Sequence, residues 1–382
     1  MLWLTIAPLD APGFRSTQIG MAEALERLGI TVRLMGKSMG GQALPVKGTT
    51  TLVPRKGRLA TELSYHYALW KLLLGKGFDI AMFEPPQLRF AIVPALLSRL
   101  GILRARFVMD VRTPPVDDSR KSLAELINYR LSMKFAKYFL SGVTVITEAL
   151  KEDLRPFFGD KLPVAVWGSA VDERLFNPSR PQYSLKKELG LESRFIFFYH
   201  GSLSMQRGLK ELLYAMEKLK ASHPDAALVL LGGGIDEEGL KALAKDLGLS
   251  ETVYFLKPVD NNAVPAYIAM ADVGVVPLPD DRCWQVSSPL KLFEYLAMQK
   301  PVLVSDIIAH RAVLGDAPYA VYARHITPEG LYGALKACIE KISFLNKSAL
   351  TARGHVLKNQ TWLSRAEALS SYLRMISGGR GK

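Results

Sequence analysis

The stretch SSPLKLFEYLAMQKPVLVSD, residues Ser287–Asp306, decides the fold because it joins a turn, an amphipathic helix and a buried strand. Ser287 and Ser288 are good N-cap residues, and Pro289 suits a first helical turn, where its missing N–H costs nothing. We therefore expect a helix to begin here. Its apolar stripe consists of Leu290, Phe293, Leu296 and Ala297.

Two charged residues share one face near the start of this helix. Lys291 and Glu294 lie three positions apart, Pro301 closes the helical unit, and Val302–Val304 predicts a short buried strand. Free N–H groups at a helix start bind anions, and a carboxylate one turn further in can accept hydrogen bonds from sugar hydroxyls. The stretch therefore predicts a sugar or ribose linked to phosphate as the ligand. A capped helix with a surface Lys–Glu pair would explain the same pattern.

Three motifs give the chain a family resemblance. Ser-Pro-Leu-Lys-Leu-Phe-Glu-Tyr, followed by Lys-Pro and a β-branched strand, resembles the donor-binding motif of retaining family 4 glycosyltransferases. Tyr199–Ala215, YHGSLSMQRGLKELLYA, resembles the Gly-rich loop and Lys/Arg-Gly helix start of that family. Gly142–Pro178, which contains VTVITEALKEDL and VWGSAVDERLFNP, resembles its interdomain stretch. The motifs occur in order at the family's spacing, so the resemblance covers nearly the whole chain.

The resemblance implies an α/β GT-B fold, in which two Rossmann-like parallel-sheet domains face a central cleft. Apolar runs alternate with helical patterns, as parallel α/β sheets require, and Pro178–Leu185 interrupts the periodicity. We expect an acceptor domain over residues 1–177, a donor domain over 178–360, and a C-terminal helix at 361–382 that crosses back to the first domain. The expected strands are Leu2–Ala7, Thr31–Met35, Asp79–Phe83, Arg106–Asp110, Gly142–Ile146, Phe195–Tyr199, Ala227–Leu231, Thr252–Phe255, Val273–Val276 and Val302–Val304.

The resemblance also implies roles for residues of the donor domain. Glu294 would hold the ribose of a nucleotide-sugar, and Arg207 would contact its diphosphate. Gly233 lies in a turn where related enzymes approach the nucleotide, and Lys257 lies in a stretch that reads the base partly through backbone groups. A surface arginine at 207 and a plain tight turn at Gly233 are the alternatives. The predicted donor-site residues are Gly201, Ser202, Arg207, Gly233, Lys257, Ser287, Ser288, Pro289, Leu290, Lys291 and Glu294.

Polar residues follow two strands of the first half. Asp110 and Arg112 lie at the carboxyl end of an apolar strand, the edge at which α/β sheets bind ligands, and we predict that they are catalytic. A purely structural Asp–Arg pair is the alternative. Gly13 and Arg15 follow the first strand, where the glycine could let the backbone approach a phosphate or sugar; a simple βα turn would also carry a glycine.

The chain departs from the family pattern at three positions. Ser202 stands where an arginine usually follows the first glycine, and Val286 stands where the first of two glutamates usually contacts the transferred sugar. Arg112 stands where many relatives have a histidine. No Asp-x-Asp motif follows a strand, so we expect a reaction without a metal, in which the helix dipole and cations stabilise the leaving diphosphate.

Length and composition agree with two domains. At 382 residues the chain exceeds the size at which one hydrophobic core usually stops growing. Cys283 and Cys338 are too few for a disulfide framework and lack metal-ligand spacing. The N-terminal MLWLTIAPLD has no basic region ahead of its apolar run, and no apolar run approaches the roughly 20 residues of a spanning helix. We therefore expect a cytoplasmic protein with peripheral association at the inner face of the membrane.

The net charge of +13 requires a polyanionic partner to be considered. Arg55–Lys76 and Arg120–Lys137 concentrate basic residues among aromatic and aliphatic ones, the mixture typical of a helix in an anionic membrane interface. A solvated helix with an ordinary buried face is the alternative. No recognised nucleic-acid module accompanies the charge, so we expect no nucleic acid partner.

The sequence as a whole is interpreted as a retaining glycosyltransferase that needs no cofactor and uses a nucleotide-diphosphate-sugar as co-substrate. The basic helices favour a lipid-linked or cell-envelope glycan as the acceptor. An epimerase or phosphorylase of the same fold is one rival, and a nucleotide-sugar-binding scaffold that has lost its chemistry is another.

Overall fold

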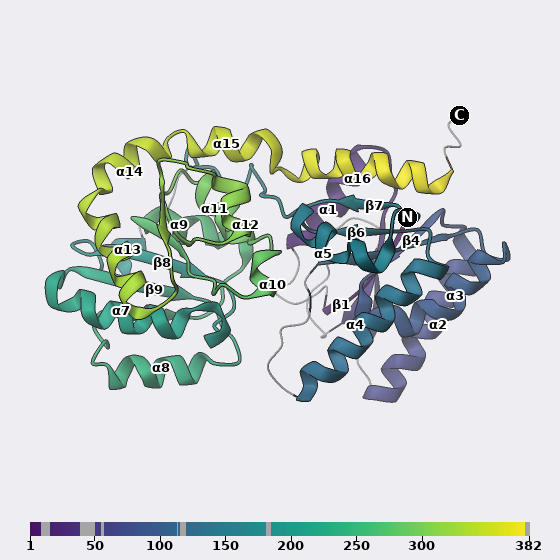
Figure 1. Cartoon of the computed structure of the whole chain (residues 1–382), viewed down its shortest axis with the longest axis horizontal. Helices are drawn as coiled ribbons and strands as arrows, with labels where there is room; N and C mark the ends of the chain where they lie inside the picture. The colour runs from purple at the N-terminus through teal and green to yellow at the C-terminus, as the bar shows by residue number, and fades with distance from the viewer. Residues whose placement is uncertain are drawn as a thin grey trace. The chain divides into compact units, whose positions relative to one another are not determined.

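The computed structural model describes residues 1–8, 16–38, 50–54, 57–112, 114, 120–180 and 185–378 (Figure 1). The chain divides into two compact units. The first comprises Met1–Ser169, Val286–Ser288 and Trp362–Lys382, and the second comprises Ala170–Gln285 and Pro289–Thr361. The C-terminal segment thus belongs to the unit that contains the N-terminus.

The first unit is built on a parallel sheet of seven strands in the order β3-β2-β1-β4-β5-β6-β7. Its strands are β1 (Leu2–Pro8), β2 (Arg33–Ser38), β3 (Thr50–Pro54), β4 (Ile80–Phe83), β5 (Arg106–Val111), β6 (Gly142–Val145) and β7 (Val164–Val166). Its helices are α1 (Ser16–Arg27), α2 (Arg58–Lys76), η1 (Pro85–Gln87), α3 (Leu88–Arg99), α4 (Arg120–Phe139), α5 (Glu148–Phe158) and α16 (Trp362–Ser377).

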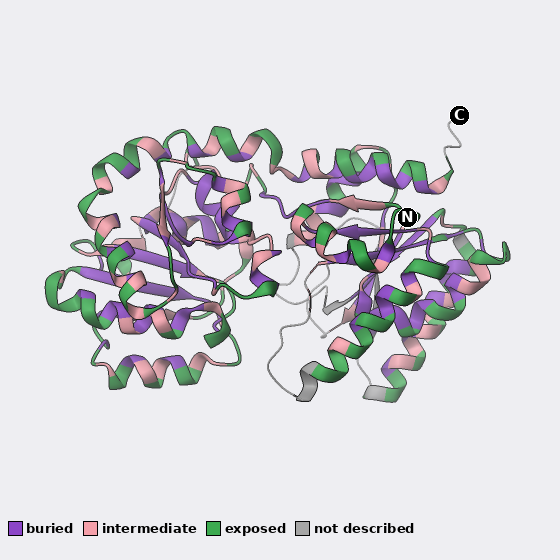
Figure 2. Ribbon diagram, viewed as in Figure 1, coloured by how far each residue is buried: buried purple, intermediate pink, exposed green. Residues whose placement is uncertain are grey.

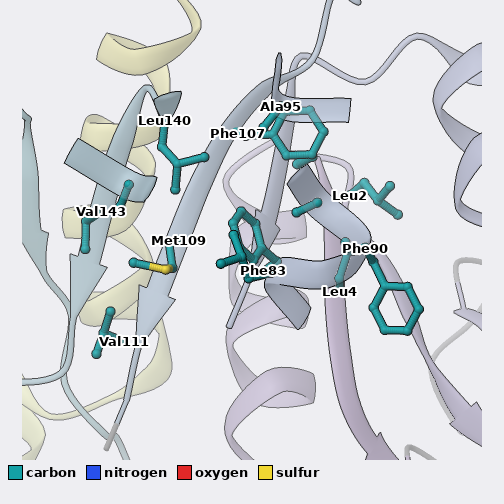
Figure 3. Close-up of a cluster of buried hydrophobic side chains, with 14 of the residues drawn as sticks. Leu2, Leu4, Phe83, Phe90, Ala95, Phe107, Met109, Val111, Leu140 and Val143 are labelled. Carbon is teal, nitrogen blue, oxygen red and sulfur yellow. The ribbon is translucent and has the colours of Figure 1, made fainter. Parts of the chain in front are cut away.

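Alternation along these strands separates two faces of the sheet. Phe83, Met109, Val111 and Val143 enter one hydrophobic cluster, which also receives side chains from α2, α3, α4 and α5 (Figure 3). Successive side chains of a strand point to opposite faces, so Asp110 points away from this cluster. That opposite face is the one on which polar chemistry can be placed.

The second unit is built on a parallel sheet of six strands in the order β10-β9-β8-β11-β12-β13. Its strands are β8 (Phe195–His200), β9 (Ala226–Leu231), β10 (Val253–Leu256), β11 (Val273–Val276), β12 (Val302–Ser305) and β13 (Ala320–Ala323). Its helices are α6 (Leu185–Glu188), η2 (Met205–Arg207), α7 (Leu209–Ser222), α8 (Glu237–Asp246), η3 (Asn261–Ala263), α9 (Val264–Met270), α10 (Arg282–Gln285), α11 (Leu290–Ala297), α12 (Ile308–Leu314), α13 (Pro328–Glu340), α14 (Ile342–Ala349) and α15 (Ala352–Asn359).

Its central strands are buried along their lengths, as strands covered by helices on both faces must be (Figure 2). The fold class expected from the sequence, two Rossmann-like parallel-sheet domains, is therefore confirmed. All ten expected strands are present. Three strands of the described part of the chain escaped prediction, namely β3, β7 and β13.

The C-terminal helix is fixed to the first sheet at a point where only glycine fits. Tyr372 of α16 donates hydrogen bonds from its Oη to the carbonyl oxygens of Val143, at 3.1 Å, and Pro163, at 2.9 Å. A Cβ on Gly142 would lie 2.0 Å from that same Oη. Gly142 thus gives the tyrosine the room to make both bonds.

We predict that Gly142→Ala lowers the free energy of unfolding by about 1–3 kcal/mol, because the added methyl displaces Tyr372 from both carbonyls. Chemical denaturation measures this change. Gly333→Ala in α13 is the matched control, since a Cβ there meets no atom within 4 Å, and it should leave stability unchanged or raised. Equal stability of the two variants would contradict the proposed docking role.

Candidate functional site

The helix expected within Ser287–Asp306 is present, but Ser287 and Ser288 do not cap it. Helix α11 begins at Leu290, Pro289 occupies the N-cap position, and no side chain caps the helix. Ser288 Oγ instead accepts a hydrogen bond from the backbone N–H of Ser169 at 3.2 Å, and Ser169 Oγ donates to the carbonyl oxygen of Ser288 at 2.8 Å. The capping prediction for Ser287 and Ser288 was therefore wrong, because Pro289 follows them at the N-cap.

The two charged residues of α11 are buried. Lys291 is 8% exposed and Glu294 is 6% exposed, which rules out a surface ion pair on a solvated helix. Oε2 of Glu294 lies 3.1 Å from Nε2 of His200 at the end of β8, an ion-pair contact when the imidazole is protonated. His200 is a partner of the glutamate that the sequence did not reveal.

Lys291 extends over an aromatic ring. Its Nζ lies 4.0 Å from the ring centroid of Tyr199 and 3.4 Å from the place that a Cβ on Gly201 would occupy. Burial lowers the pKa of the Lys291 ammonium well below its usual value, and the nearby charge of Arg207 lowers the pKa further, while Glu294 opposes the shift. The ammonium therefore lies where an added negative charge would be stabilised.

Arg207 lies half-buried in η2, directly before helix α7. Its guanidinium carbon lies 4.9 Å from the ring centroid of Trp284, and the Trp284 indole N–H donates to the carbonyl oxygen of Gln206 at 3.1 Å. Burial raises the pKa of the Tyr199 phenol to about 12, and the charge of Arg207 opposes this rise. Lys291 thus lies over the ring of Tyr199, and Arg207 is close enough to the phenol to influence its pKa.

Glycines allow the surrounding turns to approach one another. Gly201 has φ 120°, and Gly232 has φ 146°; a Cβ on Gly232 would lie 2.0 Å from the carbonyl oxygen of Gly201. Gly208 has φ 71°, and a Cβ there would lie 2.0 Å from the carbonyl oxygen of Pro277. The turn that carries Gly201 and Ser202 is therefore packed backbone to backbone against the glycine-rich turn after β9.

The remaining predicted donor residues are near this turn. Gly233 follows β9, and a Cβ on it would lie 3.3 Å from Cγ of Pro258, the residue after the exposed Lys257. Gly233 and Lys257 therefore come from adjacent turns. Gly13 and Arg15, predicted in the first βα loop, lie outside the described residues.

In the first unit, Asp110 and Arg112 both contact the indole ring of Trp167. Asp110 is fully buried, and its Oδ1 accepts hydrogen bonds from Thr144 Oγ1 at 2.7 Å and Trp167 Nε1 at 3.1 Å. The guanidinium carbon of Arg112 lies 3.8 Å from the ring centroid of Trp167, and Nη1 donates to the Trp167 carbonyl oxygen at 3.1 Å. Burial raises the pKa of Asp110, while the guanidinium and both hydrogen bonds oppose the rise.

Glu84 joins this group and was not among the predicted residues. It follows β4, and its Oε1 accepts a hydrogen bond from Nε2 of Gln18 at 3.2 Å. Burial and the negative charge of Asp110 raise the pKa of Glu84 to about 7, with Gln18, Arg112 and Gln87 opposing the rise. The sequence could have indicated Glu84, because it directly follows β4, the strand that pairs with β5.

The described residues contain neither a metal-binding cluster nor a membrane-spanning helix. No group of three or more His, Cys, Asp or Glu side chains in this part of the chain is placed to hold a metal ion. No helix among the same residues combines the length and apolarity that a membrane span requires.

Comparison with known proteins places this geometry in a family. Residues 182–342 match the family model described as Glycosyl transferases group 1. The phosphatidyl-myo-inositol mannosyltransferase of Mycolicibacterium smegmatis is 30% identical over 87% of this chain and 82% of its own length. The chain belongs to the group 1 glycosyl transferases.

Other similarities are partial or structural. A GDP-mannose-dependent alpha-(1-6)-phosphatidylinositol monomannoside mannosyltransferase from the same organism is 29% identical, over 35% of this chain and 36% of that protein. The matched region thus spans about a third of that relative. Sucrose-phosphate synthase from Thermosynechococcus elongatus has a similar structure, with a TM-score of 0.78, 15% identity and 98% of each chain covered. The family membership and this shared architecture support the expected GT-B fold class.

Proposed function

We propose that this protein is a retaining, metal-independent glycosyltransferase that moves a sugar from a nucleotide-diphosphate-sugar to an acceptor hydroxyl. One observation carries the proposal. Lys291 lies over the ring of Tyr199, Arg207 is close enough to influence both Tyr199 and Lys291 electrostatically, and among the described residues neither cation has a carboxylate within ion-pair distance. A diphosphate supplies the charge that two such cations lack.

The same cations suit the chemistry of the leaving group. When the bond from the sugar to the diphosphate breaks, negative charge grows on the diphosphate oxygens. Fixed positive charges in a site with little water stabilise this charge without reorganising. The N-terminus of α11, which begins one residue before Lys291, adds a partial positive charge. These groups support a departure of the diphosphate that depends on side chains and a helix dipole.

Glu294 is assigned to the ribose. It lies one turn inside α11 and is buried, and its Oε2 lies 3.1 Å from Nε2 of His200. A buried carboxylate accepts hydrogen bonds from neighbouring hydroxyl groups, and a ribose offers two of them. Gly233 and Lys257, in adjacent turns, are assigned to the nucleotide on the same proposal.

We propose a lipid-linked or cell-envelope glycan as the acceptor, because two helices of the first unit expose apolar stripes. On α2 the exposed residues follow one another at spacings of four, four and seven positions, and their exposures are Leu59 74%, Leu63 62%, Tyr67 71% and Leu74 71%. On α4 the same spacing gives Leu123 59%, Ile127 51%, Leu131 55% and Tyr138 64%. Lys71, Lys134 and Lys137 are also exposed on these helices.

The two stripes belong to the same side of the first sheet. The inner faces of α2 and α4, which include Tyr65, Leu69, Tyr129 and Met133, enter one hydrophobic cluster. Apolar side chains interleaved with lysines suit an anionic lipid interface, in which the apolar groups enter the lipid and the lysines meet the headgroups. A protein partner would not require the lysines. We therefore assign these faces to an anionic membrane at the inner side of the cell membrane.

Two rival functions make different predictions for the purified protein. An epimerase or phosphorylase of the same fold would act on the donor without an acceptor hydroxyl, or would need free phosphate. An inactive scaffold would bind the donor and leave it intact. The relatives' names suggest GDP-mannose as the first donor and phosphatidylinositol vesicles as the acceptor, and a structural neighbour solved with UDP-glucose suggests the alternative donor. Sugar transfer with retained anomeric configuration supports the proposal, and donor binding without transfer or hydrolysis favours the scaffold.

We predict that Glu294→Gln lowers kcat/KM roughly tenfold to a hundredfold, because a hydrogen bond to a charged group contributes about 1.5–3 kcal/mol. Nucleotide affinity should fall by a similar factor in calorimetry. Glu192→Gln is the matched control, since Glu192 is exposed in the same unit. Nucleotide affinity equal to that of the unsubstituted protein would remove Glu294 from the donor site.

Substitutions of Arg207 and Lys291 should differ in their effect on the pH dependence of GDP affinity. Burial lowers the pKa of Lys291 in the free protein, and a bound diphosphate should raise it again, so the protein should take up a proton on binding. Affinity for GDP should therefore fall as pH rises above about 7.5, where the charge of the nucleotide is constant. Lys291→Met should weaken binding and abolish this dependence. Arg207→Ala should weaken binding by about 1.5–3 kcal/mol and preserve it. Calorimetry across pH checks both, and an unchanged pH dependence in Lys291→Met would contradict the assignment.

Membrane binding should depend on the exposed lysines of α2 and α4. We predict that the protein binds phosphatidylglycerol vesicles at low salt and is released at high salt, since each basic residue near the surface contributes about 1 kcal/mol. Replacing Lys71, Lys134 and Lys137 with Gln should weaken binding strongly in a sedimentation assay. Replacing Lys187, Lys347 and Lys358, exposed in the second unit, removes the same charge and should have little effect. Equal binding by both triple variants would refute the assigned surface.

A further inference from the structure

Three polar residues form a row across neighbouring strands of the first unit. The register pairs Phe83 of β4 with Met109 of β5, so Glu84 follows beside Asp110. The register also pairs Asp110 with Thr144 of β6, and the 2.7 Å hydrogen bond between their side chains agrees with it. Adjacent strands lie about 4.8 Å apart, so Glu84, Asp110 and Thr144 are successive neighbours.

The row lies on the face of the sheet that is opposite the hydrophobic cluster. Phe83, Met109 and Val143 precede the three polar residues and point into that cluster (Figure 3). Alternation along a strand therefore sends Glu84, Asp110 and Thr144 the other way. Glu84 and Asp110 are also at the carboxyl ends of their strands, the edge at which parallel α/β sheets bind ligands.

One carboxylate oxygen in this row has no hydrogen-bond partner among the residues that the structure describes. Oδ1 of Asp110 accepts two hydrogen bonds, but its Oδ2 is buried and accepts none from the described residues. A buried oxygen that has lost its water without gaining a donor is costly, so such atoms usually indicate a bound donor. Glu84, beside it, accepts from Gln18 through Oε1. A substrate hydroxyl supplies the donor that Asp110 Oδ2 lacks, whereas Glu84 is the N-cap residue of η1 and is already hydrogen-bonded to Gln18 and Gln87.

We propose that Glu84 and Asp110 together form a subsite that binds hydroxyl groups of the acceptor, with the ionised carboxylate of Glu84 accepting a hydrogen bond from the acceptor. This inference rests on the proposed glycosyltransferase function and adds Glu84 to it as a specificity-determining residue. The row selects a polyol or sugar acceptor, because neighbouring carboxyl groups match neighbouring hydroxyls. A simple alcohol would occupy only one of them.

The charged and titratable groups that face Glu84 set its ionisation. Burial, the largest cause, and the charge of Asp110 raise the pKa of Glu84 to about 7, while Arg112 opposes the rise. Tyr65 of α2 also faces Glu84, because the charge of Glu84 raises the pKa of the Tyr65 phenol. Glu84 therefore changes from mostly protonated to mostly ionised between about pH 6 and pH 8. Apparent affinity scales with the fraction of the competent form, so the acceptor KM should fall about tenfold over this range.

The test uses the full chain in the transfer assay with phosphatidylinositol vesicles. Glu84→Gln should raise the acceptor KM at pH 8 roughly tenfold to a hundredfold, leave nucleotide affinity unchanged, and remove the dependence of KM on pH. Glu84→Asp keeps a carboxylate on a shorter side chain, so it should raise KM and retain a pH dependence. The exposed Glu192→Gln is the matched control and should behave as the unsubstituted protein.

Thermal unfolding provides a readout that does not need the acceptor. Because the pKa of Glu84 is raised in the folded protein, its contribution to stability is complete below its unfolded pKa, near 4.5, and is lost as pH rises through about 7. Glu84→Gln cannot ionise, so its Tm relative to the unsubstituted protein should increase from pH 5.5 to pH 8. The same relative Tm at both pH values would show that Glu84 does not titrate as inferred.

The outcomes separate this inference from the proposed function. If the unsubstituted protein transfers the sugar but Glu84→Gln has an unchanged acceptor KM, the subsite is refuted and the glycosyltransferase proposal stands. If the unsubstituted protein transfers to no acceptor with either donor, the proposed function fails and the subsite fails with it. A higher KM, together with unchanged nucleotide affinity and a lost pH dependence, supports both.

Discussion

The buried ammonium of Lys291 is the constraint on which the second unit depends. A charge away from water is costly unless another group compensates it. Every residue from Lys291 to Ala297 is buried, so the side chain cannot reach bulk water by extending along the helix. The ring of Tyr199 offsets part of this cost, about 0.5–2 kcal/mol for a cation over an aromatic face. The uncompensated part of this cost lowers the pKa of the ammonium, and a bound anion would offset it.

The first unit buries negative charge, whereas the second unit buries positive charge. Glu84 and Asp110 place two carboxyl groups next to each other, and the guanidinium of Arg112, stacked on Trp167, compensates only part of their charge. In both units the charges gather at the carboxyl ends of parallel strands, where backbone turns leave room for ligands. In the proposed enzyme each sheet thus positions one site: the second unit would hold the anion, and the first unit would hold the hydroxyl groups. A transferase needs both.

Much of this arrangement could be predicted from the sequence, for identifiable reasons. Long apolar runs such as Ala227–Leu231 fix the central strands, and Lys291, Glu294 and Arg207 occur within motifs of characteristic spacing. Short edge strands such as β7, which is only partly buried, give too weak a signal. The role of Glu84 depends on strand register, and that of His200 on the packing of α11 against β8. No local pattern carries this information, because both contacts join residues far apart in the chain.

The departures from the family pattern can be explained by what each position contributes. The carbonyl oxygen of Ser202 accepts a hydrogen bond from Tyr199 Oη at 2.8 Å, so this position helps to hold the ring beneath Lys291 through its backbone, which any residue provides. Val286 is buried in the hydrophobic cluster of the first unit, and its carbonyl oxygen accepts a hydrogen bond from Thr147 Oγ1 at 2.7 Å. A glutamate in that apolar environment would carry a large desolvation cost. In the proposed donor site the positive charge therefore comes from Lys291 and Arg207, and the valine contributes packing.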